Sequence, residues 1–351
     1  MGTIGIVDFG SYLPARKLDT SAFELKNDPL SSSPLFQAPR FRHHKDQDQR
    51  ASDMIELAAR PMFERLGLKP SDNIDVIITN VLLPDVPITG CGAEVAHRLG
   101  CHPEWIVDLH NGGCAAFPYM LKLAQKLLDG QTARRALLCN VQNTAGTIFS
   151  QAELRSMPQA AVPGDGSGVA YVVSDEGSPV LAVETRHEPQ CAVDMDVAAS
   201  SGRKYWQSGA GAVNVIFDSG KFEEIIARGN SLVPQVVRDL CRTMAIEVGE
   251  IDFLVTNQPN RLFLRNWQRE LGIEPSRHLD TFDTFGNLYG AALPITFDHA
   301  LREGTVRDGS LVVVAGFAHA GDFAAAAAIR WRGNGTNTDP VADYICKGAM
   351  L

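Results

Sequence analysis

The residue best suited to covalent chemistry is Cys114, in the segment DLHNGGCAAFPYMLKLAQKLLDG at 108–130. The apolar run 105–109 is predicted to be a strand, and a Gly-Gly pair separates it from a long apolar pattern typical of a helix. Cys114 is therefore expected at a strand-to-helix elbow. A helix N-terminus carries partial positive charge and free N–H groups, which favour the nucleophilic thiolate. The alternative is that Cys114 is a small core residue.

Composition excludes several classes of protein. The chain has 351 residues, 45% of them hydrophobic and 21% charged, which is typical of globular proteins and sufficient for two cores or one duplicated domain. A net charge of −9 argues against a nucleic-acid partner. Seven cysteines form no C-x-x-C pair, so neither a metal site nor a disulfide framework is expected. With no secretory leader pattern, we expect a cytoplasmic protein.

The elements that must position Cys114 can be read from hydrophobic periodicity. The most apolar run, 311–329, contains His319 and Asp322, so we expect a buried strand pair and no membrane association. Pro61 is expected to end or kink the helix that contains it, or to start a second helix. Further strands are predicted at 3–9, 74–80, 133–143 and, after a glycine-rich turn, within 163–175; helices are predicted at 51–66, 90–99 and 221–247.

Residues 19–50 lack strong periodicity and include Ser31 to Ser33, several prolines and a basic cluster. A stretch this long is typical of a functional loop, a lid or a partner surface. Its basic residues are suited to a phosphate-bearing substrate, or they form a solvated face. His43 and His44 are adjacent and cannot face one ligand together, so we expect a solvated surface there and no metal site.

The two halves of the chain share short sequences in the same order. IDVIITN at 74–80 is repeated as IDFLVTN at 251–257, and CAAFP at 114–118 as GAALP at 290–294. Three further matches are LGC with LGI, LLDG with LREG, and ALLCN with LVVVAG. The pattern predicts two copies of a strand–helix–strand–helix unit, with helices sandwiched between sheets. We place the halves at 1–175 and 176–332, followed by a tail at 333–351. Cys114 and the turn at 287–290 then lie near the pseudo-axis, where a site is expected.

Four motifs together resemble the ketoacyl-acyl carrier protein synthase III family of the thiolase superfamily. They are NGGCAAFPYML; GDGSG at 164–168; FGNLYGAALPITFDHALREG at 285–304; and LVVVAGFAHAGDFAAAAAIRW at 311–331. The resemblance covers about residues 3–332. It implies an α/β fold, a thiolase-like duplicated αβαβα layered sandwich. In that family a cysteine takes an acyl group from acyl-CoA or an acyl carrier protein and passes it to a second substrate.

The resemblance also carries expectations about partners. No separate cofactor is implied, because the acyl-CoA or phosphopantetheine thioester is itself the substrate. The family is usually homodimeric, with sheets that continue across the interface, and the apolar strand at 136–141 and the loop at 144–163 would suit that contact.

Residue by residue, the family site implies that Cys114 accepts the acyl group and that Asn287 is the family asparagine. Asn257, in NQPN, occupies the position where the family usually has histidine. In condensing members the family histidine and the family asparagine hold the thioester carbonyl and stabilise the enolate. Asparagine can donate a hydrogen bond but cannot carry charge or accept a proton as imidazole can. Losing such a donor costs about two to three orders of magnitude in rate, so the change brings condensation into question but not thioester formation.

His319 lies in AGFAHAGD, where the resemblance places a glycine-rich loop near the cysteine. A histidine with a nearby aspartate, here Asp322, can deprotonate a hydroxyl or amine acceptor. Alternatively, His319 contributes only its backbone. His110, four residues before Cys114, is a further candidate whose direction strand alternation leaves ambiguous.

The leading interpretation is acyl transfer through Cys114 to a small-molecule acceptor, as in acyltransferase-like relatives from polyketide and other secondary-metabolite pathways. One alternative is a 3-oxoacyl synthase that primes by decarboxylative Claisen condensation despite Asn257. Another is a non-catalytic subunit of a heteromeric synthase.

Overall fold

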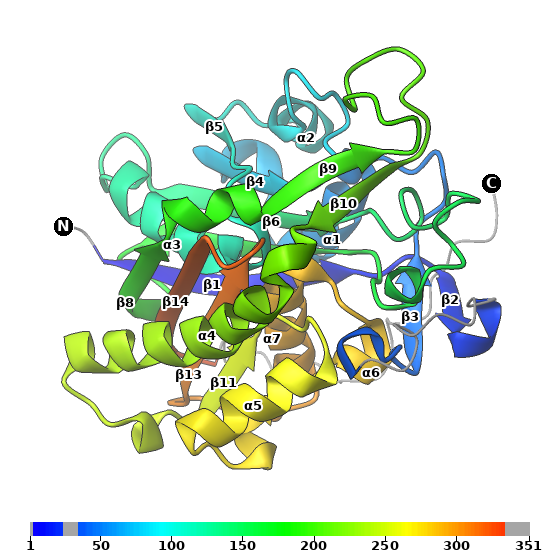
Figure 1. Ribbon diagram of the computed structural model, residues 1–351. Coiled ribbons are helices and arrows are strands. Elements are labelled where there is room, and N and C mark those ends of the chain that lie inside the picture. The colour runs from blue at the N-terminus through cyan, green and yellow to red at the C-terminus, as the bar shows by residue number, and fades with distance from the viewer. Residues whose placement is uncertain (1–2, 24–33, 334–351) are drawn as a thin grey trace.

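Ten of the described strands form one continuous sheet built from two five-stranded halves (Figure 1), and two further strand pairs lie outside it. The computed structural model describes residues 3–23 and 34–333; Ser31 to Ser33 and most of the predicted tail lie outside them. The first half has the order β5-β4-β6-β7-β1 and the second β12-β11-β13-β14-β8, joined where β1 pairs with β8. The first half comprises β1 (Ile4–Tyr12), β4 (Val76–Val81), β5 (Trp105–Asp108), β6 (Arg135–Gln142) and β7 (Gly166–Ser174). The second comprises β8 (Ser178–His187), β11 (Phe253–Thr256), β12 (His278–Leu279), β13 (Leu311–Ala318) and β14 (Phe323–Arg330).

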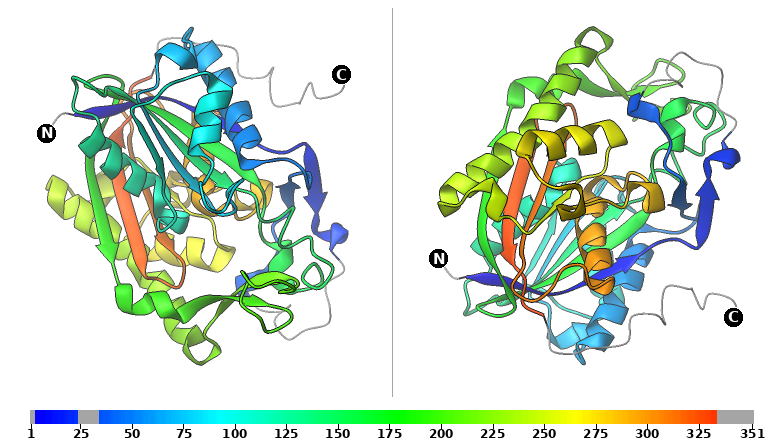
Figure 2. Two further views of the ribbon diagram at one scale, coloured as in Figure 1. Left: turned by 90° about the horizontal axis from the view of Figure 1, so that it is seen from above. Right: turned by 90° about the horizontal axis from the view of Figure 1, so that it is seen from below.

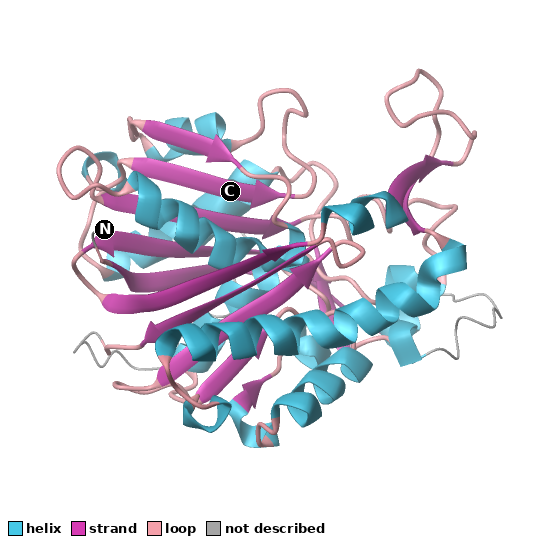
Figure 3. Ribbon diagram, turned by 60° about the vertical axis from the view of Figure 1, so that its left-hand side comes forward, coloured by secondary structure: helices cyan, strands magenta, loops and turns pink. Residues whose placement is uncertain are grey.

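The helices lie in three layers around these sheets. Helices α3 (Ala116–Leu127) and α7 (Ala292–Arg302) pack between the two halves. Figure 2 shows α1 and α2 on one outer side and α4 and α5 on the other, and Figure 3 shows helices against the faces of the strands. The outer helices are α1 (Ala51–Arg65), α2 (Gly92–Leu99), α4 (Phe222–Met244) and α5 (Arg261–Leu271), and a short α6 (Phe282–Phe285) follows them.

Strands buried on both faces explain the long apolar runs in the sequence. In β4, Val76 and Ile78 face the core that contains α3 and α7, whereas Ile77 faces the core beneath α1 and α2. A third core joins α4 and α5 to the other face of the second half. A parallel sheet covered on both sides needs apolar residues at nearly every position. The predicted αβαβα layered sandwich is confirmed, and the run 311–329 is the antiparallel pair β13–β14.

The order of strands in the second half repeats that of the first. β4, β5 and β6 are parallel to one another, as are β11, β12 and β13, and an antiparallel strand flanks each group. β7 ends at Ser174 and β8 begins at Ser178. The division into halves at 175 and 176 remains our proposal for the domain boundary.

Two predictions about local structure were wrong, and a third was wrong in part. Pro61 does not end α1, which runs to Arg65. Leu57 and Pro61 both lie on the exposed face of α1, where water can bond the carbonyl that proline leaves without a backbone donor. The strand at 136–141 lies within β6, which is flanked by β4 and β7 in the middle of the sheet, so it cannot form a dimer edge. β5 is the edge strand of this half.

The third error concerns the paired histidines. They end β3 (Phe41–His44), which pairs with β2 (Arg16–Asp19) in a two-stranded sheet. His44 is only 3% exposed, and burial lowers its pKa to about 4, with Arg42 and Arg16 acting in the same direction. The Nδ1 atom of His43 lies 2.6 Å from the carbonyl oxygen of Pro14. The segment is therefore packed into the protein, not solvated.

Helices α3 and α7 begin at matching elbows, the 3₁₀ turns η5 (Gly113–Ala115) and η11 (Tyr289–Ala291). Gly113 and Tyr289 occupy equivalent positions and both have φ of 47°. A Cβ atom added to Gly290 would lie 2.6 Å from the carbonyl oxygen of Gly113 and 2.8 Å from Oδ1 of Asn80. The two elbows can therefore touch only because residue 290 has no side chain.

We expect Gly290→Ala to lower the free energy of unfolding by about 1–3 kcal/mol, because the added methyl group overpacks this contact. Gly249→Ala is the matched control, since a Cβ atom there would meet nothing within 4 Å and its φ is unstrained. Denaturant unfolding of both variants measures the difference. Equal stabilities would contradict the tight contact between the elbows.

Candidate active site

Cys114 lies in the η5 elbow, immediately before α3, as the sequence predicts. The residue is half-buried. Burial raises the pKa of its thiol to about 12, and a hydrogen bond with the Asn257 side chain only partly offsets this. Burial thus opposes the thiolate form that the helix N-terminus was expected to favour. A base is needed to generate the nucleophile at neutral pH.

Asn257 follows the last residue of β11 and is 1% exposed. Its Nδ2 donates a long hydrogen bond of 3.5 Å to the carbonyl oxygen of Phe317, while Oδ1 has no partner. A Cβ atom added to Gly316 would lie 2.9 Å from the carbonyl oxygen of Cys114 and 3.3 Å from Oδ1 of Asn257. The amide thus lies beside the cysteine with an unused acceptor atom, which can bond a substrate N–H or O–H group.

His319 begins the turn between β13 and β14 and forms a dyad with Asp322. Its Nδ1 lies 3.0 Å from Oδ1 and 3.1 Å from Oδ2 of that carboxylate. The other ring nitrogen, Nε2, faces the cysteine elbow, because a Cβ atom added to Gly113 would lie 2.8 Å from it. The alternative that His319 contributes only its backbone gives no account of this hydrogen bond or of this orientation.

The backbone of His319 has φ of 53°, in the left-handed region that favours glycine. A non-glycine residue there costs on the order of 1–2 kcal/mol. The cost is retained within a loop that the resemblance describes as glycine-rich. Strain of this kind concentrates at functional sites, so the observation supports a role for the side chain.

Asn287 lies at the same end of the molecule, three residues before Gly290. Its Oδ1 accepts a 3.0 Å hydrogen bond from the backbone N–H of Tyr289. Its backbone N–H donates to Val162, and its carbonyl accepts from Gly164. These contacts fix the loop that carries Asn287.

The sequence interpretation missed Tyr289. Burial raises the pKa of its hydroxyl, and the nearby Cys114 and Asp165 act in the same direction. The signal was present in the repeat, because the match of CAAFP with GAALP makes Tyr289 the counterpart of Gly113. His110, by contrast, is exposed in the loop before the elbow and loses support as a base.

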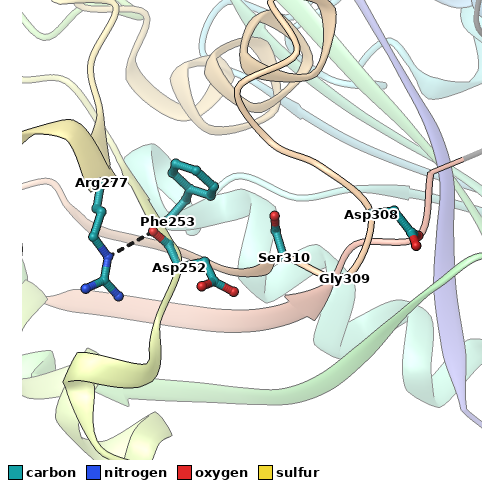
Figure 4. A pocket seen from close by; sticks show the side chains of 6 residues that line it. All are labelled: Asp252, Phe253, Arg277, Asp308, Gly309 and Ser310. Atoms are coloured by element: carbon teal, nitrogen blue, oxygen red, sulfur yellow. Dashed lines mark hydrogen bonds between the residues drawn. The ribbon is translucent and has the colours of Figure 1, made fainter.

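Other parts of the described chain offer less for catalysis. A pocket of about 520 Å³ is lined by Asp252, Phe253, Arg277, Asp308, Gly309 and Ser310 (Figure 4). It lies where β11 and β13 begin, at the opposite ends of these strands from Asn257 and His319. Among residues 3–23 and 34–333, no group of three or more potential ligands could hold a metal ion. No helix within these ranges is long and apolar enough to span a bilayer.

The arrangement has the parts of a covalent acyl-transfer site. A half-buried thiol lies at an elbow, an imidazole nitrogen faces that elbow, and a carboxylate holds the other ring nitrogen. A nucleophile, a base and a group that orients the base are the pattern expected for nucleophilic catalysis.

Comparison with known proteins identifies related sequences. Residues 241–331 match the model for the C-terminal part of 3-oxoacyl-[acyl-carrier-protein] synthase III. A β-ketoacyl-[acyl-carrier-protein] synthase III from Rhizorhabdus wittichii is 25% identical over 328 residues, covering 93% of this chain and 98% of the relative.

Solved structures show the same fold. The 3-oxoacyl-(acyl carrier protein) synthase III of Pseudomonas aeruginosa has a TM-score of 0.79 at 22% identity, covering 94% of this chain and 99% of the other. The priming β-ketosynthase of the R1128 polyketide pathway has a TM-score of 0.80 at 19% identity, covering 94% and 96%. The match over residues 241–331 and the relative that aligns along nearly the whole chain support membership of the ketoacyl-acyl carrier protein synthase III family, and the solved structures show that the fold is the same.

Proposed function

We propose that the protein is an acyltransferase that takes an acyl group from acyl-CoA or an acyl carrier protein onto Cys114 and passes it to a hydroxyl or amine of a small-molecule acceptor. The observation that carries the proposal is the His319–Asp322 dyad, whose Nε2 faces the cysteine elbow. The retained acyl-transfer nucleophile and the loss of the condensing histidine at Asn257 support it.

In the first step Nε2 of His319 takes the thiol proton as the sulfur of Cys114 attacks the donor carbonyl. Asp322 stabilises the imidazolium that forms. The tetrahedral intermediate expels the donor thiolate, which recovers the proton from His319. This step needs the base, because burial leaves little thiolate at neutral pH.

In the second step the same nitrogen deprotonates the acceptor as its oxygen or nitrogen attacks the thioester. The carbon–sulfur bond breaks, and the proton returns to the sulfur of Cys114. The unpaired Oδ1 of Asn257 is available to orient the acceptor. No carboxylate has to leave, so a histidine at position 257 is not required.

Two other functions make different demands on the same residues. Condensation would have to proceed with an amide at position 257, and the likeness to a priming β-ketosynthase keeps it as the alternative. That pathway name also suggests acceptors from secondary metabolism. A non-catalytic subunit would have no use for a His–Asp dyad on a strained backbone turn.

Because a thiol nucleophile must stay reduced, we further propose a cytoplasmic setting.

Incubation with a panel of acyl-CoAs should add one acyl group to Cys114, detected by intact mass, and Cys114→Ala should abolish the adduct. We expect His319→Gln to slow acyl transfer by about 10²–10⁴-fold, the usual contribution of a positioned base. His97→Gln, at an exposed residue of α2, is the control. An unmodified wild-type protein, or an assembly that retains full activity with Cys114→Ala, would favour the non-catalytic subunit.

Release of carbon dioxide from a malonyl donor separates transfer from condensation. The wild-type protein should release none above the level of Cys114→Ala, because an amide stabilises the enolate poorly. Asn257→His should raise the release by about 10²-fold, since it restores the missing donor, and Asn257→Gln should not. Wild-type release that keeps pace with loading of Cys114 would establish condensation instead.

We also propose a homodimer in which the sheets continue across the interface through β5. This strand has a free edge, and Trp105 and Ile106 are 46% and 40% exposed on it. An open, apolar strand edge favours pairing with a second copy. The loop at 144–163 remains the other predicted contributor.

Ile106→Lys should therefore shift the protein toward the monomer, because it introduces like charges at a self-complementary edge. Leu181→Lys, at an exposed leucine of β8, should have no such effect. Size-exclusion chromatography with light scattering measures both. A monomeric wild-type protein would exclude the proposed interface.

A further inference from the structure

The turn that carries the dyad is held from outside at two points. Nε of Arg228 donates a 3.0 Å hydrogen bond to the carbonyl oxygen of Ala320. The backbone N–H of Glu188 donates a 2.7 Å bond to the carbonyl oxygen of Asp322. These two contacts restrain the turn on either side of Gly321 and oppose the relaxation of the unfavourable φ of His319.

Arg228 lies within α4 and supports the turn by packing as well as by hydrogen bonding. A Cβ atom added to Gly321 would lie 3.1 Å from Cβ and 3.2 Å from Nε of Arg228. The turn is therefore seated directly on this side chain. A shift of the guanidinium would move Ala320 and, through the backbone, the neighbouring His319.

The guanidinium is itself anchored by Asp194. Nη2 of Arg228 donates to Oδ2 of Asp194 at 2.6 Å, and Nζ of Lys221 donates to Oδ1 at 2.7 Å. The Asp194 side chain is 2% exposed. Lys221 and then Arg228 hold the pKa of this carboxyl below its usual range. Charge-assisted hydrogen bonds with little solvent access are stronger and more directional than exposed ones.

Asp194 also marks the base of a projecting hairpin. β9 (Met195–Ala199) and β10 (Val213–Phe217) pair directly beyond it, and the N–H of Asp218 donates to the carbonyl oxygen of Asp194. Figure 1 shows this hairpin and its long loop extending from the body of the protein. A continuous set of hydrogen bonds thus runs from the hairpin base through Asp194 and Arg228 to the catalytic turn.

We propose that Arg228, held by Asp194, is a positioning residue that fixes His319 for proton transfer at Cys114. The inference rests on the proposed function, because it assumes that His319 is the base. The competing explanation is an ion pair that only stabilises the packing of α4.

The test compares steady-state acyl transfer by Arg228→Met, Arg228→Lys and Asp194→Asn with that of the wild-type protein. We expect Arg228→Met to lower kcat by about 10–100-fold with KM within twofold, because a displacement of about 1 Å misaligns a catalytic group. Arg228→Lys should keep part of the rate that Arg228→Met loses. An ammonium group can bond the Ala320 carbonyl or the Asp194 carboxylate, but it lacks the planar guanidinium that bonds both. Arg238→Met is the matched control, because Arg238 lies on the same helix and pairs with the exposed Glu270.

A double-mutant cycle with His319→Gln separates positioning from stability. If Arg228 acts through His319, Arg228→Met should cause less than a twofold further loss in the His319→Gln background. Equal losses in both backgrounds, or a wild-type kcat in Arg228→Met, would overturn the inference. Should Arg228→Met fail to fold, Asp194→Asn and Arg228→Lys carry the same cycle.

The outcome also distinguishes this inference from the proposed function. If His319→Gln transfers acyl groups at the wild-type rate, the proposed base is wrong. If His319→Gln is slow but both Arg228 variants and Asp194→Asn are normal, the base stands and only the positioning role fails.

Discussion

The contact between the two elbows is the constraint on which the site depends. Gly290 lies so close to the Gly113 carbonyl that a single added carbon would clash. This approach brings the starts of α3 and α7 together at the centre of the duplicated sheet. It also places Cys114 beside the carboxyl ends of β11 and β13, from which Asn257 and the His319 turn extend. The site is therefore a product of the duplication, although only one elbow carries a nucleophile.

The fold was largely predictable because its strands are buried on both faces. Residues 74–80 and 251–257 had to be apolar for this reason, and the repeat between them indicated the second copy. The errors arose where burial depends on distant partners. Nothing near His44 in the sequence shows that β2 and β3 pair and fold against the body of the protein. Nothing near β6 shows that two strands flank it.

The candidate site was predictable to the extent that its residues lie in motifs. Cys114, Asn257 and His319 each stand out by type and position, and the contacts across Gly113 and Gly316 bring them to one place. Tyr289 was missed because an aromatic residue in an apolar segment indicates packing, not chemistry. The support of the dyad by Arg228 was beyond sequence reasoning, because it joins residues 92 positions apart through a backbone carbonyl.

The raised pKa of Cys114 explains why a histidine near the cysteine matters for the proposed chemistry. A thiol with a pKa of about 12 is a poor nucleophile at neutral pH unless a base removes its proton during attack. Asn257 cannot act as that base, since an amide does not accept a proton under these conditions. His319 can, provided that its ring is held, and the carboxylate of Asp322 and the restrained turn provide that hold. Under the proposed function, Asn257 stands where the resemblance places a histidine, and His319 supplies the imidazole from the turn between β13 and β14. The two residues are then two parts of the same chemical change.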